Sequence, residues 1–377
     1  MRVLIVMLPR VSKSAITHLK GILQPGHVPE DIDLILYANQ LIIDSIGDID
    51  KKVRVVSDNN IPSHPIKMHL WRINNISRLI DLYKPNIHFC VLEHLGRLPN
   101  ETVKHVVMSR TLQPFLASER KRFPILSYDR LKMFFLYKYY QNSLNRADGV
   151  IFLTDFVRDF LKELGVNCKD SIVIQHGIPD YFRRKPVIKQ LPKYPKILYV
   201  SDIMEYKFQW NVAKGVDILR KRTGIEIQLE LVGKKTKYGW PILNKTLAEL
   251  NNPDWIAIKD PVPYSEVHKI YQSCDVFVFA SSVETISNIL LEAMASGLPI
   301  AYTNLRPMKD ILEDDGLSFN HENPDSIADA LEKYFLDDNL RYKAALGAYN
   351  RAIRYNWKET ADATFNYLKK ISISEKH

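Results

Sequence analysis

The chain has 377 residues, which is enough for two domains that each bury a core of their own. Hydrophobic residues make up 46% and charged residues 25%, which are ordinary values for a globular protein. The three cysteines, Cys90, Cys168 and Cys274, are widely separated and form neither a CxxC pair nor a disulfide framework. A reducing cytosol is therefore the expected compartment.

The net charge of +9 calls for an anionic partner. Nucleic acid is not expected, because the chain has no zinc-finger, RRM or KH motif and its charge is not one block. An anionic membrane surface or a phosphate-bearing lipid acceptor fits the charge. No apolar run approaches the roughly 20 residues that span a bilayer, and the start, MRVLIVMLP, is better explained as a first strand than as a signal peptide. We expect a cytoplasmic protein, or one peripheral at the inner face of the membrane.

Strand-like and helix-like stretches alternate along the first half. Helical spacing occurs at 15–23 and at 64–83, where Ile76, Leu79 and Tyr83 share one face. Such alternation predicts a parallel sheet with helices on both faces. The apolar, strand-like runs are 3–8, 34–37, 53–56, 87–92, 106–108, 150–153 and 172–174.

The pattern breaks into prolines and lysines in RRKPVIKQLPKYPK, residues 183–196, and then restarts. The break predicts a linker at 186–195 between an N-terminal domain, 1–185, and a C-terminal domain, 196–357. Ligands of doubly wound sheets bind at the carboxyl ends of the strands, so two such domains predict a shared cleft.

One stretch, VFVFASSVETISNILLEAMASGLPIAY at 276–302, predicts a buried strand, a loop, a helix and a second strand. Either Ser287 or Asn288 can cap the helix, and Gly297 ends it. The first turn of a helix leaves backbone N–H groups unpaired and favours negative charge, so 285–288 is a candidate phosphate site. Glu292 is suited to accept two hydrogen bonds from a vicinal diol such as a ribose. Together these features predict a nucleotide or nucleotide-sugar site.

Glu284 and Glu292 have seven residues between them, and Glu292 is followed by Ala-Met-Ala-Ser-Gly-Leu-Pro. This pattern resembles the signature of retaining GT-B glycosyltransferases of family 4, also called glycosyl transferases group 1. The resemblance implies a GT-B fold, with two doubly wound Rossmann-like domains facing a central cleft. It also implies that Glu292 holds the donor ribose, that Glu284 faces the sugar ring, and that the backbone of Thr285, Ile286, Ser287 and Asn288 meets phosphate and sugar. Trp357 and Tyr367 resemble the family's closing helix, which implies that 358–377 packs back on the first domain.

The family places an arginine and then a lysine after the first strand of the C-terminal domain, to neutralise the donor diphosphate. Lys207 matches the lysine, but Asp202 stands at the arginine position. Either another cation substitutes, with Lys234 and Lys235 as candidates, or the loop is arranged differently. These lysines fit a solvated loop equally well.

The N-terminal domain departs further from the family. The loop after the first strand lacks the usual glycines, so Arg10 or Lys13 would reach the phosphate or the acceptor, unless the loop only caps the next helix. Arg110 stands where the family often has a histidine that contacts the donor sugar. Arginine cannot act as a base but can hold a phosphate or carboxylate. His94 ends a strand and is a cleft candidate, although a lone histidine is more often structural.

The segments 118–122 and 127–146 combine basic residues with Leu131, Phe134, Phe135 and Tyr139. They are the best candidate for a membrane-surface contact, and the alternative is a core helix with cationic edges. The tripeptides Asp31-Ile32-Asp33 and Asp48-Ile49-Asp50 resemble a metal motif of another glycosyltransferase architecture. No metal is expected, because a helix N-terminus and Lys207 can hold a diphosphate.

The sequence thus predicts a metal-independent, retaining hexosyltransferase with Glu284, Lys207 and Arg110 as catalytic residues. The donor would be a UDP- or GDP-sugar, and the acceptor a saccharide or lipid-linked saccharide of a bacterial cell-surface or capsular polysaccharide. Two alternatives stay open: a nucleotide-sugar epimerase or phosphorylase of the same fold, and a non-catalytic partner subunit.

Overall fold

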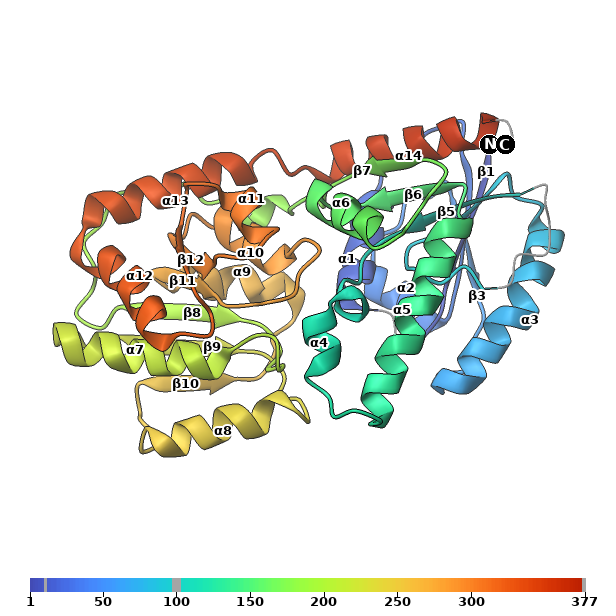
Figure 1. Cartoon of the computed structure of the whole chain (residues 1–377). Coiled ribbons are helices and arrows are strands. Elements are labelled where there is room, and N and C mark those ends of the chain that lie inside the picture. Colours follow the sequence, from blue (N-terminus) through green and yellow to red (C-terminus); the bar gives the residue numbers. More distant parts are fainter. Residues whose placement is uncertain (10–11, 97–102, 375–377) are drawn as a thin grey trace. The chain divides into compact units, whose positions relative to one another are not determined.

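The computed structural model describes residues 1–9, 12–96 and 103–374. The chain forms two compact units, each with its own sheet (Figure 1). Unit 1 comprises residues 1–177 together with the tail from Asn356, and unit 2 comprises Ile178–Tyr355. Residues 186–195, the predicted linker, lie within unit 2, where Lys189 Nζ pairs with Asp275 at 2.8 Å.

Within the described residues, unit 1 has a seven-stranded parallel sheet in the order β3-β2-β1-β4-β5-β6-β7. The strands are β1 (Arg2–Met7), β2 (Asp33–Ala38), β3 (Val53–Ser57), β4 (Ile87–Cys90), β5 (Lys104–Met108), β6 (Gly149–Phe152) and β7 (Ser171–Val173). The helices are α1 (Lys13–Ile22), α2 (Gln40–Ile46), α3 (Pro65–Tyr83), α4 (Ala117–Lys121), α5 (Tyr128–Arg146), α6 (Asp155–Glu163) and α14 (Trp357–Ile373), with a 3-10 turn at Gln113–Phe115.

Polar caps and apolar runs account for these elements. In β4, β5 and β6 every residue is buried, as expected for strands covered on both faces. Ser12 caps α1 by accepting the N–H of Ala15 at 3.2 Å, and Thr154 caps α6 in the same way. Local sequence therefore fixes both the strands and the starts of the helices that connect them.

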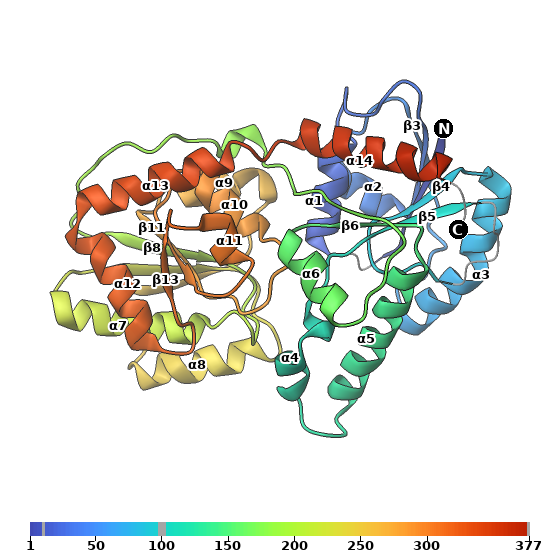
Figure 2. The ribbon, with the colours of Figure 1, turned by 45° about the horizontal axis from the view of Figure 1, so that its top comes forward.

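Unit 2 repeats the plan, with a six-stranded parallel sheet in the order β10-β9-β8-β11-β12-β13 among the described residues. Figures 1 and 2 show α7 and α8 on one face of this sheet and α9 and α10 on the other. The strands are β8 (Lys196–Val200), β9 (Gln228–Val232), β10 (Ile256–Lys259), β11 (Val276–Phe279), β12 (Ile300–Thr303) and β13 (Leu317–Phe319). The helices are α7 (Gln209–Thr223), α8 (Gly239–Glu249), α9 (Tyr264–Gln272), α10 (Asn288–Ala295), α11 (Met308–Leu312), α12 (Pro324–Leu336) and α13 (Asp338–Ala352), with a 3-10 turn at Asp180–Phe182.

Both sheets have the strand order of a doubly wound fold, in which the chain winds outward in two directions from a central pair of strands. That central pair is β1 and β4 in unit 1, and β8 and β11 in unit 2. The prediction of two doubly wound, Rossmann-like domains is confirmed.

Helix α14 belongs to unit 1 although it follows unit 2 in the sequence. Trp357 at its start packs against Gly21 and Gly177, and Tyr367 packs against Gly149. The Tyr367 hydroxyl donates to Asp170 at 3.2 Å. Glycine is required at these positions because an added Cβ would lie within 3 Å of the helix's atoms.

We expect Gly21→Ala to destabilise unit 1, because the new Cβ would lie 2.1 Å from Trp357 Cε3. Overpacking of this kind costs about 1–3 kcal/mol. The urea midpoint measures the effect, and Lys20→Ala, an exposed change on the same helix, is the control. Equal midpoints for the two variants would mean that Trp357 does not dock closely on α1.

Candidate functional site

The central strands of unit 2 bring two charged side chains together. Lys207 lies in the loop after β8 and Glu284 in the loop after β11, and Lys207 Nζ is 2.5 Å from Glu284 Oε1. The N–H of Ser282 donates to the carbonyl of Tyr206 at 2.8 Å, which ties the two loops together. Lys207 is only 7% exposed, so the ion pair lies in a largely dehydrated setting where its charges interact strongly. Ligands of doubly wound sheets bind at this reversal of strand order.

Helix α10 begins at the same edge of the sheet. Ser287 is its N-cap, and the Ser287 hydroxyl accepts the N–H of Leu290 at 3.3 Å. Of the two residues predicted as caps, the structure selects Ser287 and makes Asn288 the first helical residue. Thr285, Ile286 and Ser287 are at most 7% exposed, whereas Asn288 is half-buried. The positive end of the helix dipole therefore lies directly after the loop that carries Glu284.

Glu292, in the middle of α10, faces α9. Its Oε1 accepts the hydroxyl of Tyr264 at 2.8 Å and its Oε2 accepts the hydroxyl of Tyr271 at 3.1 Å. The side chain is 5% exposed, and burial raises the pKa of Glu292 to about 7, against the two hydrogen bonds, which lower it. Phe182 supports both tyrosines, with ring centroids 5.8 Å from each. The two hydroxyls fix the direction of the carboxylate.

Tyr264 and Tyr271 are missing from the residues predicted from sequence. Their spacing of seven residues puts them on one face of α9, which is a signal that could have found the pair. Nothing in the sequence, however, indicates that this face meets Glu292.

Asp202, the acidic residue at the family's arginine position, joins two loops. Its Oδ1 accepts the N–H of Lys234 at 3.0 Å, and its carbonyl accepts Gln209 Nε2 at 3.1 Å. Gly233 permits this approach, since a Cβ there would lie 2.0 Å from the carbonyl oxygen of Ser201. The side chain of Lys234, one of the two candidate substitutes for the family's arginine, is exposed at the same sheet edge.

Arg110 lies in unit 1, after β5, and is 9% exposed. Its Nη2 donates to the carbonyl of Ser14 at 2.6 Å and to the Ser14 hydroxyl at 2.7 Å, and lies 3.2 Å from His176 Nε2. Burial lowers the pKa of Arg110 to about 10. The Arg110 guanidinium therefore holds the first turn of α1 to the segment around His176.

His94 also lies in unit 1, where its ring contacts Tyr139 and Tyr140 at centroid distances of 5.7 and 5.1 Å. Burial lowers the pKa of His94 to about 3, so this ring is neutral at physiological pH. Arg10, the other predicted cleft residue, lies outside the described residues.

Glu93 is a buried carboxylate that the sequence did not single out. Its Oε1 accepts the N–H of Arg110 and that of Thr111, and burial raises its pKa. Glu93 follows β4, one of the two central strands of unit 1, and it ties that strand's end to the end of β5.

Three aspartates of the two DxD tripeptides have structural partners. Asp31 pairs with Lys369 at 2.7 Å, Asp33 with Arg2 at 2.6 Å, and Asp50 accepts the N–H of Gly26 at 2.7 Å. Across 1–9, 12–96 and 103–374, no cluster of three or more His, Cys, Asp or Glu side chains is placed to hold a metal ion. None of the helices within those ranges is long and apolar enough to cross a membrane.

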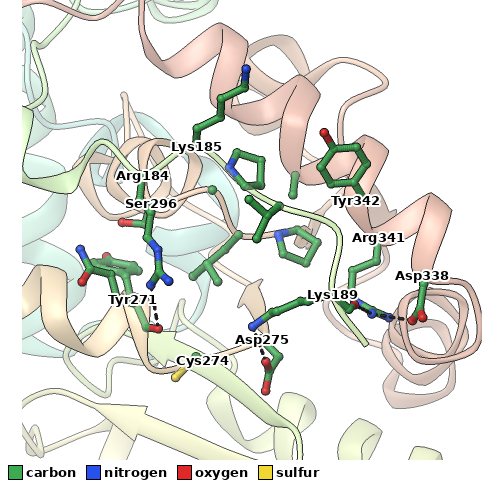
Figure 3. A pocket seen from close by; sticks show the side chains of 17 residues that line it. Arg184, Lys185, Lys189, Tyr271, Cys274, Asp275, Ser296, Asp338, Arg341 and Tyr342 are labelled. Atoms are coloured by element: carbon green, nitrogen blue, oxygen red, sulfur yellow. Dashed lines mark hydrogen bonds and ion pairs between the residues drawn. The ribbon is translucent and has the colours of Figure 1, made fainter. Parts of the chain in front are cut away.

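A pocket in unit 2 lies at the opposite end of the strands (Figure 3). It is lined by the strap 184–189, the turns that precede β11 and β12, and the start of α13. Inside it Lys189 points to Asp275 and Arg341 to Asp338 (Figure 3). Tyr271 contributes to its wall, but none of the predicted site residues does. Because ligands of doubly wound sheets bind at the carboxyl ends of strands, we place the candidate site at Lys207, Glu284 and α10 instead.

Comparison with known proteins defines first the class of fold. Over 98% of this chain and 99% of the other, the structure resembles sucrose-phosphate synthase from Thermosynechococcus elongatus, with a TM-score of 0.73 and 14% identity. It also resembles Anabaena HepE in complex with UDP-glucose, over 98% of this chain and 100% of the other, with a TM-score of 0.72 and 13% identity. The fold is therefore that of the GT-B class.

A family model matches the sequence of unit 2. Residues 182–351 match the profile described as Glycosyl transferases group 1, which confirms the resemblance to that group over this part of the chain. The O-antigen chain mannosyltransferase B of Escherichia coli is 24% identical over 64% of this chain and 65% of its own length. The D-inositol 3-phosphate glycosyltransferase of Paenarthrobacter aurescens is 27% identical over 47% of this chain and 44% of its own. The chain thus spans less than two thirds of the length of these curated relatives.

The pKa of Glu292 leads to a prediction about stability. A carboxyl whose folded pKa is about 7, against an ordinary value of 4.5, binds its proton more tightly in the folded state. Its contribution to stability is present below pH 4.5 and is lost as the pH rises to 7. We expect Glu292→Gln to remove this loss, so that between pH 4.5 and 8 the wild-type free energy of unfolding falls by on the order of 3 kcal/mol relative to that of the variant.

Urea midpoints of both proteins across that range measure the difference. Glu266→Gln, which removes an exposed carboxylate from the first turn of α9, is the matched control. If wild type and Glu292→Gln follow the same pH dependence, the carboxyl does not carry a raised pKa.

Proposed function

We propose that the protein is a retaining glycosyltransferase of family 4 that moves a sugar from a UDP- or GDP-sugar to a hydroxyl. The observation that carries the proposal is the meeting of Lys207, Glu284 and the start of α10 at the central strands of unit 2. A cation and a helix N-terminus at one sheet edge favour a diphosphate, and two carboxylates beside them favour the hydroxyls of a sugar and a ribose.

In this proposal, leaving-group stabilisation dominates catalysis. As the bond to the sugar breaks, negative charge develops on the departing diphosphate. The N–H groups at 285–288 and the ammonium of Lys207 donate hydrogen bonds to the departing diphosphate. Because the negative charge grows as the bond breaks, these donors stabilise the transition state more than the bound donor. An ammonium has three donors, so Lys207 can stay paired with Glu284 and still donate to a phosphate oxygen. Lys234 supplies a second cation at the same edge.

The two glutamates divide the recognition of the donor. Glu284 follows β11 and faces the transferred sugar, and its carboxylate accepts hydrogen bonds from the hydroxyls of that sugar. Glu292 accepts the ribose diol through lone pairs beyond the two that Tyr264 and Tyr271 use, since an ionised carboxylate has about four acceptor positions. Arg110 acts in unit 1 as a positioning residue through Ser14 and His176. No metal ion enters this mechanism.

The likeness to HepE in complex with UDP-glucose supports a nucleotide-sugar donor. The likeness to an O-antigen mannosyltransferase supports a saccharide or lipid-linked saccharide acceptor in cell-surface polysaccharide synthesis.

Kinetics of two variants test the assigned roles. Lys207→Ala removes a charge that acts on the leaving group, so kcat should fall by about a hundredfold. Glu292→Ala removes a charged acceptor of the ribose, so the donor KM should rise about tenfold or more. The control is Lys237→Ala, an exposed lysine further along the loop that carries Lys234. Donor kinetics unchanged in both variants would remove these roles.

Calorimetric titration with UDP- and GDP-sugars separates the rival functions. A non-catalytic subunit binds none of them, and an epimerase or phosphorylase turns over donor without an acceptor alcohol. The anomeric configuration of the product, read by NMR, tests retention.

A further inference from the structure

The connection between α4 and α5 in unit 1 exposes several large apolar side chains. We call residues 117–138 the α4–α5 tip. Ile125, Leu126 and Tyr128 at its turn are 77%, 82% and 78% exposed. On α5, Leu131, Phe134 and Phe135 follow at 46%, 48% and 67%. Figures 1 and 2 show this turn at the free end of α5, projecting beyond the sheet of unit 1.

The sequence left two interpretations of this segment open, a membrane-surface contact and a core helix with cationic edges. The exposure of these side chains decides between them. A core helix would bury Leu131, Phe134 and Phe135, but α5 buries only Met133, Tyr140, Ser143 and Leu144. Scattered exposed apolar residues are ordinary on protein surfaces, whereas six within eleven residues form a patch of the kind that marks an interaction site.

Helix α3 extends the apolar surface. It lies beside α5, where the rings of His69 and Tyr139 meet at a centroid distance of 5.9 Å. Near its start, α3 exposes Ile66 at 67% and Leu70 at 53%. The apolar surface therefore involves two neighbouring helices of unit 1.

The charge of the α4–α5 tip is strongly positive. It has six basic residues against two acidic ones. One of the acids, Glu119, is 1% exposed and is paired with Arg122 at 2.8 Å. Lys121, Lys132 and Lys138 are exposed. The same segment thus exposes cations together with the apolar side chains, and their charge complements an anionic surface.

We propose that the α4–α5 tip docks on the surface of an anionic lipid bilayer. Its aromatic and aliphatic side chains enter the boundary between headgroups and acyl chains, while the lysines remain at the lipid phosphates. A projecting tip that mixes Phe, Tyr and Leu with Lys and Arg suits this boundary, where aromatic rings and long cationic side chains are both favoured. The docking deepens the proposed function, because it would bring unit 1 to a lipid-linked acceptor, but lipid binding itself does not depend on that function.

Vesicle flotation of the full chain tests the proposal, with vesicles of phosphatidylcholine alone and of phosphatidylcholine mixed with phosphatidylglycerol. We expect binding to the mixed vesicles only, weakened by added salt. Leu126→Asp should lower the affinity by about tenfold or more. Leu126 has a φ of +69°, which aspartate tolerates better than most residues, so this variant should fold.

Leu41→Asp is the matched control, since Leu41 is also in unit 1, is 75% exposed and undergoes the same substitution on α2. It should bind vesicles as wild type does. The double variant Lys121→Gln/Lys132→Gln should lose affinity at low salt and show a shallower salt dependence.

Three results would overturn the proposal: no flotation with either vesicle, equal binding to both, or equal losses for Leu126→Asp and Leu41→Asp. Wild type that forms dimers, with Leu126→Asp monomeric and no flotation, would assign the patch to self-association instead. Because donor titration is measured separately, failure to bind lipid leaves the proposed transfer reaction standing, and failure to bind donor leaves the lipid result standing.

Discussion

The ion pair between Lys207 and Glu284 is the interaction on which the candidate site depends. Two nearly buried charges are stable only as partners, so the pair holds the loops after β8 and β11 at one distance from each other. Those loops belong to the two central strands of the sheet, and the second of them leads into α10. The fold thus presents a cation, a carboxylate and a helix N-terminus at one edge, and the proposed chemistry needs little more than that juxtaposition.

Glu292 illustrates how the same unit manages a buried acid. Burial alone would favour its neutral form, and the hydroxyls of Tyr264 and Tyr271 offset part of that penalty. A carboxyl that titrates near neutrality is sensitive to whatever approaches it. Hydroxyl donors from a ribose would favour the ionised form further, so donor binding and ionisation of Glu292 should be linked.

Local patterns predicted the elements well, and long-range contacts were beyond them. The apolar run 3–8 predicted β1, helical spacing at 64–83 predicted α3, and one of the two proposed caps is the cap of α10. Each of these depends on residues that are neighbours in the chain. Tyr264 meets Glu292 across 28 residues and Asp202 meets Lys234 across 32, and such pairings arise only when the sheet assembles. The exposure of Leu126 and Phe135 is likewise a property of the folded surface, because apolar residues in this sequence pattern are equally compatible with a buried core position.

The return of α14 to unit 1 has a consequence for biogenesis. During translation the ribosome completes all of unit 2 before it makes α14. Until then, the surfaces of unit 1 at Gly21, Gly149 and Gly177 remain uncovered. Maturation of the first unit is therefore coupled to completion of the second. A stalled polypeptide that ends before Trp357 would present these bare glycine-lined surfaces to chaperones and proteases.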